Sequence, residues 1–82
     1  MLISPAQNLP SKDEQFQRLH SIVLSSSGEV NWQGLSEKER RAVERFVWLH
    51  CMHPLHQRRI EAQGLDYVWA SVRQGPRLYG LA

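Results

Sequence analysis

Four residues of the types that bind zinc lie close together in the second half of this 82-residue chain: His50, Cys51, His53 and His56. Imidazole nitrogens and thiolates are common ligands of a tetrahedral zinc ion, and four are enough for one site. The spacing argues against such a site, because on a helix Cys51 points about 100° away from His50. Pro54 also redirects the chain before His56, and no second Cys/His cluster exists. We therefore expect no metal and no cofactor, and interpret the histidines as groups whose partial charge is favourable at a helix C-terminus.

Other catalytic arrangements find little support in the sequence. Cys51 beside a histidine could suggest a thiol nucleophile. The adjacent His50 points elsewhere on a helix, however, and nothing resembles an oxyanion loop. The acidic residues fall in helix caps or mixed-charge faces, and neither a P-loop nor a dinucleotide-binding glycine motif is present. We expect no enzyme activity and a buried or half-buried Cys51.

The segment that must position these residues runs from Ser36 to His53, and it shows the clearest helical pattern in the chain. Ser36 and Glu39 have the spacing of a capping box, in which each side chain bonds the other residue's amide. Pro54 disfavours helical backbone at the residue before it. The pattern therefore predicts a central helix that begins after Ser36 and ends near Met52 or His53.

The central helix is apolar on more than one side. At about 100° per residue, Trp48 and Met52 lie in line with Arg41 and Arg45. The opposite face holds the residues that we expect to point into the core: Ala42, Val43, Phe46, Leu49 and His50. Because a helix that is apolar nearly all round needs cover on every side, either a neighbouring helix or a partner must cover Trp48 and Met52.

The N-terminal half of the chain contains a second capping box, formed by Ser11 and Glu14. Apolar residues then recur at helical spacing, which predicts a first helix from about Lys12 to Leu24. The run of three serines and Gly28 that follows should end this helix. Residues 1–10 contain two prolines and no periodicity, so we expect an extended arm.

Two further helices are expected after the central one. Pro54 suits the first position of a helix that ends at Gln63, since its missing amide proton is not needed there. Gly64 suits the position just after that helix. Residues 66–72 also have the composition of a strand. We favour a helix there, because no second convincing strand exists to pair with it, and residues 77–82 form a tail.

The fold class that follows is all-α: a small bundle of three to four short helices with an extended N-terminal arm. We assign residues 1–10 to the arm and residues 11–82 to a single helical domain. The expected core consists of apolar residues from several helices: Phe16, Leu19, Val23, Val43, Phe46, Leu49, Val68 and Val72.

Composition sets further bounds. Ten basic and eight acidic residues give a net charge of only +2, with the two signs interleaved along the central helix, a poor pattern for binding phosphates. The single cysteine fits a reducing compartment. The N-terminus lacks the pattern of a signal peptide, and the longest apolar run, Phe46 to Leu49, is far too short to span a bilayer. A cytoplasmic protein that does not enter the membrane is the expectation.

The function that fits best is that of a small non-enzymatic regulatory protein. It would bind and block or modulate another protein, such as a transcription factor or an enzyme, through Arg41, Arg45, Trp48 and Met52. Tryptophan, methionine and arginine are enriched in interface cores. The overfull apolar helix also predicts a homodimer, with the central helices in symmetric contact.

The alternative is a small nucleic-acid-binding protein of the helix-turn-helix type. The central helix, the turn at His53 and Pro54, and the following helix give a crude version of that motif. Gln57, Arg58 and Arg59 would then contact bases or phosphates. The steep salt dependence of phosphate binding would separate this alternative from apolar contact with a protein.

Overall fold

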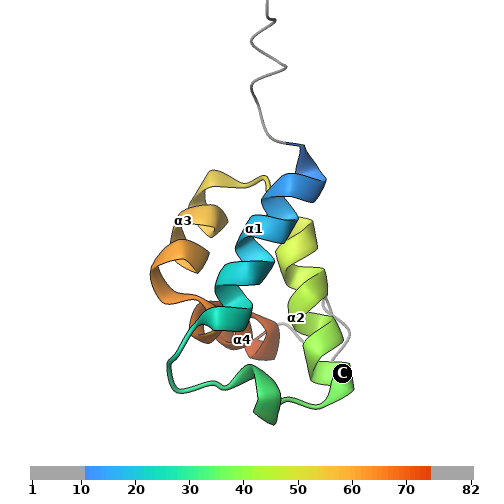
Figure 1. Cartoon of the computed structure of the whole chain (residues 1–82), viewed down its shortest axis with the longest axis vertical. Coiled ribbons are helices and arrows are strands. Elements are labelled where there is room, and N and C mark those ends of the chain that lie inside the picture. The colour runs from blue at the N-terminus through green and yellow to red at the C-terminus, as the bar shows by residue number, and fades with distance from the viewer. Residues whose placement is uncertain (1–10, 75–82) are drawn as a thin grey trace, which may run out of the picture.

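Four α-helices and one 3-10 turn make up the part of the chain that the structure describes. The computed structural model describes residues 11–74 (Figure 1). The elements in order are α1 (Lys12–Ser25), η2 (Trp32–Gly34), α2 (Glu37–His50), α3 (Pro54–Gln63) and α4 (Leu65–Gln74). The all-α prediction is confirmed, and residues 66–72 are helical rather than a strand. The arm at residues 1–10 and the tail at residues 77–82 lie outside the described residues.

Both expected capping boxes are formed. The amide of Glu39 donates to Ser36 Oγ at 3.2 Å, and the amide of Ser36 donates to Glu39 Oε1 at 2.7 Å. The corresponding distances for Ser11 and Glu14 are 3.2 Å and 2.8 Å. Each pair provides acceptors for two backbone amides that the helix itself leaves without partners. The starts of α1 and α2 are therefore determined by local sequence.

The helix α2 ends at His50, which is earlier than the expected end near Met52 or His53. Pro54 holds His53 in an extended conformation (φ −92°, ψ 120°), so the chain must leave the helix before it. The side-chain amide of Gln57 donates to the carbonyl oxygen of Cys51 at 2.6 Å. That bond gives one of the free carbonyls at the end of α2 a partner and ties the turn to α3.

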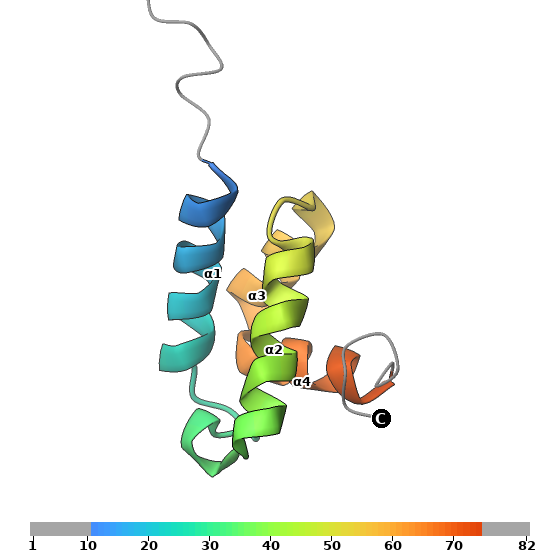
Figure 2. The same cartoon turned by 90° about the vertical axis from the view of Figure 1, so that its right-hand side faces the viewer.

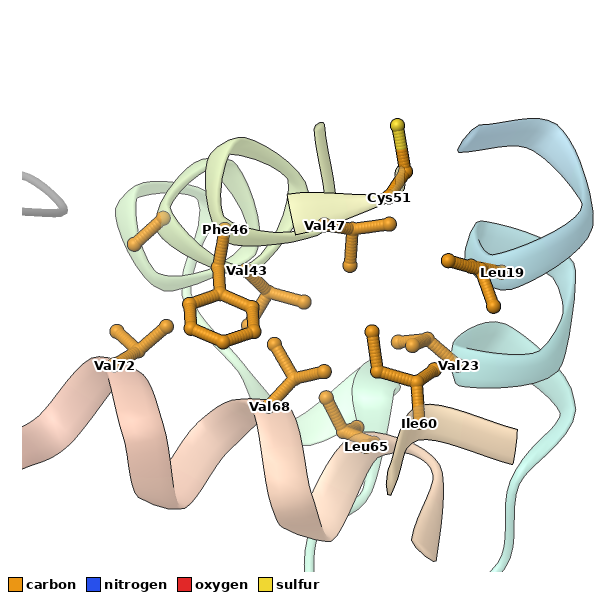
Figure 3. Packing of buried hydrophobic residues seen from close by; sticks show 11 residues of the cluster. Leu19, Val23, Val43, Phe46, Val47, Cys51, Ile60, Leu65, Val68 and Val72 are labelled. Atoms are coloured by element: carbon orange, nitrogen blue, oxygen red, sulfur yellow. The ribbon is translucent and has the colours of Figure 1, made fainter. Parts of the chain in front are cut away.

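The core lies between α2 and the three other helices. In Figure 3, side chains from α1 and α4 approach those of α2, with Phe46 and Val68 near the middle. Eleven buried residues form this cluster: Leu19, Val23, Ala42, Val43, Phe46, Val47, Cys51, Ile60, Leu65, Val68 and Val72. Phe46 is the largest of them. Phe16, also expected in the core, is half-buried at the edge of the cluster.

The expectation that Leu49 belongs to the core is wrong, because 52% of its surface is exposed. Val47 and Cys51 are buried instead. The buried half of α2 runs from Ala42 through Phe46 to Val47 and Cys51, because α1 packs on the Cys51 side and α4 on the Phe46 side (Figure 3). Leu49 falls on the remaining side, which no described helix covers.

The loop after α1 is fastened to the start of α4. The carboxylate of Asp66 accepts from the amides of Glu29, at 3.2 Å, and Val30, at 2.9 Å. The hydroxyl of Ser26 accepts from the amide of Leu65 at 3.1 Å. These bonds join residues nearly forty positions apart and provide partners for amides that neither helix could satisfy.

Two glycines make this contact possible. Gly64 has φ +59°, and a Cβ atom there would lie 2.5 Å from the Cβ atom of Ser26. A Cβ atom on Gly28 would collide with the carboxylate of Asp66. The turn between α3 and α4 and the loop after α1 therefore approach each other as closely as backbone atoms allow.

No helix among residues 11–74 has both the length and the apolar composition needed to cross a lipid bilayer.

Candidate functional site

The side of α2 that faces away from the other helices carries a continuous row of exposed residues. Arg41, Arg45, Trp48, Leu49 and Met52 fall within an arc of about 100° on the helix and the turn that follows it. Trp48 is 38% exposed, Met52 50% and Leu49 52%. Figure 2 shows α2 in front of α3 and α4, with α1 beside it and no described element in front of it. We call this surface the outer face of α2.

Four of these five residues are those that the sequence predicted as a binding surface. Leu49 was missed, because it was assigned to the core. The sequence pattern carries no signal that could have found it, because apolar side chains occur on every side of this part of the chain. Leu55, 46% exposed in the first turn of α3, adds another apolar side chain shortly after Met52.

Trp48 sits at the edge of the outer face, against α1. The ring of Phe16 meets the ring of Trp48 edge to face, with centroids 5.5 Å apart. The ammonium group of Lys12 lies 4.4 Å from the centroid of the Trp48 ring. A helix of the same chain therefore covers one side of Trp48, while the rest of the ring stays exposed beside Leu49 and Met52.

The charge on the outer face is mainly positive. Arg41 forms an ion pair with Glu37 one turn earlier, whereas Arg45 has neither an ion pair nor a hydrogen bond to any residue among 11–74. Residues 45–60 include three arginines and three histidines but no aspartate or glutamate. The exposed apolar side chains of the outer face thus belong to a segment, residues 45–60, that contains no aspartate or glutamate.

Three histidines meet at the corner between α2 and α3. Ring centroids are 4.2 Å apart for His50 and His56, and 4.9 Å apart for His53 and His56. Pro54 does redirect the chain, but it starts α3 directly after the turn, and His56 in the first turn of that helix still meets His50 at the end of α2. The ring nitrogen Nδ1 of His56 lies 2.7 Å from the hydroxyl of Tyr67.

Burial and mutual repulsion act on these imidazoles. Burial is the main cause that lowers the pKa of His50, followed by the neighbouring His56 and His53. Burial likewise lowers the pKa of His56, with smaller contributions from His53 and Arg59. The rings of His50 and His56 lie side by side, tilted by 35°. Within residues 11–74, no group of three or more His, Cys, Asp or Glu side chains is arranged to hold a metal ion.

Cys51 points away from the histidines, towards α1. Its Sγ atom lies 3.4 Å from the carbonyl oxygen of Trp48 and 3.7 Å from that of Lys12. Burial raises the pKa of the thiol, while the nearby Lys12 opposes that shift. A thiol kept protonated is a poor nucleophile, so the geometry gives no support to cysteine-based catalysis.

The residues of the nucleic-acid alternative are split between two roles. Gln57 uses its amide to hold the turn after α2, through the bond to the carbonyl of Cys51. Arg58 and Arg59 are exposed on α3. Of the three side chains, those of Arg58 and Arg59 are therefore available to an external ligand.

Comparisons with protein-family models, with curated proteins and with solved structures found no match to this chain. The fold and the outer face define a small all-α bundle with an exposed apolar and basic surface on its second helix.

Proposed function

We propose that this protein is a non-enzymatic regulatory protein that binds another protein, such as a transcription factor or an enzyme, through the outer face of α2. One observation carries the proposal: Trp48, Leu49 and Met52 are adjacent and between 38% and 52% exposed. Contiguous apolar surface on a small protein commonly marks an interaction site. Arg45, which has no partner among residues 11–74, adds a side chain of the type enriched in such sites.

The histidine corner and Cys51 support binding better than catalysis. The thiol is buried with a raised pKa, and the histidines pack on each other rather than around a common point. A protein that acts by covering a surface of its target requires none of these groups to react. A cytoplasmic location fits this function, because a single reduced cysteine is usual there.

A pull-down from the native host tests the proposal. Leu49→Gln removes apolar surface from the outer face at an exposed position, and Arg73→Glu changes an exposed residue on α4 as the matched control. Proteins captured by the wild type and by Arg73→Glu but lost with Leu49→Gln would support the proposed face. If Leu49→Gln captures the same proteins as the wild type, the outer face of α2 is not the binding surface.

A second copy of the chain is another occupant of this face, as the homodimer prediction requires. Light scattering at micromolar concentration would then show about twice the chain mass of 9.5 kDa. A dimer that Leu49→Gln dissociates would assign the outer face to self-association. A monomer at all accessible concentrations would remove the homodimer prediction.

Nucleic acid remains the competing class of ligand, because Arg58 and Arg59 are exposed on α3. Salt separates the two: neutralising several phosphates makes affinity fall steeply as salt rises, whereas apolar burial changes little. A steep salt slope for a labelled duplex, abolished by Arg58→Ala with Arg59→Ala, would favour the nucleic-acid alternative.

A further inference from the structure

Three exposed residues on α2 and Met52, in the turn after it, follow the spacing of a helix-packing stripe. Arg41, Arg45, Trp48 and Met52 are separated by four, three and four positions. That alternation keeps side chains in line along one side of a helix and is the spacing by which one helix packs along another. From Arg41 to Met52 the stripe extends for about 16 Å. A surface of this shape suits a helical segment that lies along it.

The charges along the stripe indicate which charge a partner helix should carry. Lys12 stands beside Trp48, and Arg45 is exposed without an ion pair among residues 11–74. Arg58 and Arg59 lie on α3, further along a stretch of sixteen residues, 45–60, that contains no carboxylate. Lys12 and Arg45 thus form a cationic rim beside the apolar side chains. Such a rim attracts a partner whose own rim is acidic.

The acidic residues nearest in sequence do not neutralise this rim. Glu44 contacts the ring nitrogen of His20 at 3.1 Å, on the side of α2 that faces α1. Glu37 is paired with Arg41. Asp13 lies in the first turn of α1, where helix amides favour a carboxylate. Among residues 11–74, no carboxylate is paired with Arg45, which lies next to the apolar side chains.

We propose that the outer face of α2 binds an acidic amphipathic helix of the partner protein, with apolar residues on Trp48, Leu49 and Met52 and carboxylates facing Arg45 and Lys12. This inference rests on the proposed function and names the chemistry of its partner. A second copy is a poorer match, because a two-fold axis through the outer face would oppose two stretches that lack carboxylates. Nucleic acid leaves the exposed apolar side chains without contacts.

Two synthetic helical peptides test the partner chemistry with the full chain. Each has about 18 residues, long enough to span the stripe, with leucines along one face and either glutamate or lysine on both flanks. A fluorescent label reports binding by anisotropy. The glutamate peptide should bind at least about ten times more tightly than the lysine peptide, since like charges across an interface are strongly disfavoured.

Three variants locate the binding. Leu49→Gln should lower the affinity for the glutamate peptide by about tenfold, as loss of a central apolar contact does. Arg45→Glu should lower the affinity for the glutamate peptide and raise the affinity for the lysine peptide, each by about fivefold, because it reverses a surface charge. Arg73→Glu makes the same charge change on α4, at a residue outside the stripe, and should alter neither affinity by more than about twofold.

Each other outcome overturns the inference in a recognisable way. Equal binding of both peptides, lost with Leu49→Gln, would leave the proposed binding face standing and refute the acidic partner. Binding of neither peptide at millimolar concentration would also refute the acidic helix, while the pull-down still tests the face independently. A chain dimer that excludes the peptide would make a second copy the occupant. Tighter binding of a DNA duplex than of the glutamate peptide would favour the phosphate ligand.

Discussion

Replacing Gly64 by alanine tests whether the close approach of the α3–α4 turn to the loop after α1 is required by the fold. Gly64 has φ +59° and ψ −136°, a conformation that only glycine adopts readily, and forcing another residue into it costs about 1–3 kcal/mol. The added Cβ atom would also lie 2.5 Å from the Cβ atom of Ser26, so Ser26 must move.

Movement of Ser26 has its own cost. Its hydroxyl donates to the carbonyl of Val23 at 2.8 Å and accepts from the amide of Leu65 at 3.1 Å. Each such bond contributes about 0.5–1.5 kcal/mol. Together with the backbone cost, we expect Gly64→Ala to lower the free energy of unfolding by about 2–4 kcal/mol. This is a large share of the stability of so small a protein.

Urea denaturation followed by circular dichroism measures this loss, and two other glycines calibrate it. Gly28→Ala should cost about 1–2 kcal/mol, because its Cβ atom displaces the carboxylate of Asp66 from two amides. Gly34→Ala meets no atom within 4 Å and has no positive φ, so it should be neutral or stabilise by up to about 1 kcal/mol. If Gly64→Ala unfolds at the same urea concentration as Gly34→Ala, the account of this contact is wrong.

Two further predictions concern α2 and the histidine corner. Phe46→Ala should lower the free energy of unfolding by about 3–5 kcal/mol because it empties the centre of the core, whereas Leu49→Ala should cost less than about 1 kcal/mol because Leu49 is exposed. Equal thermal melts of the two variants would contradict this assignment of the faces of α2. The fold lowers the pKa of His50 and of His56, so the unfolded chain binds protons more readily than the folded protein. Stability should therefore be full above pH of about 6.5, where unfolded histidine is neutral, and fall as the pH drops through that value towards the lower folded pKa. Replacing both histidines by glutamine should make the urea midpoint nearly independent of pH between pH 7.5 and pH 5.5. If the midpoint of this variant still falls with pH as steeply as that of the wild type, His50 and His56 are not the cause.

Signals that act within a few residues were readable from the sequence. Ser11 with Glu14 and Ser36 with Glu39 located the starts of α1 and α2, because a capping box involves only one turn of chain. Pro54 likewise located the start of α3. Such features need no knowledge of the neighbouring helices, which explains why the helix order was predicted correctly.

The direction in which α2 faces could not be read in the same way. Between Phe46 and Met52 apolar side chains occur on every side of the helix, so periodicity does not distinguish the buried side from the exposed one. Contacts with α1 and α4 decide that Cys51 is buried and Leu49 is not. The meeting of His50 with His56 was missed for a related reason, since it depends on the direction that α3 takes after the turn.

The position of Cys51 turns the protein's single thiol into a reporter of local opening. The Sγ atom has no exposed surface and sits below the first turn of α1, at the carbonyl of Lys12. An alkylating reagent can reach it only when that turn lifts from the end of α2. The labelling rate of the native protein, relative to that of the unfolded chain, therefore measures the free energy of that single opening. Occupation of the neighbouring Trp48 by a ligand would slow the labelling if it holds α1 and α2 together, which provides a readout of binding without any attached probe.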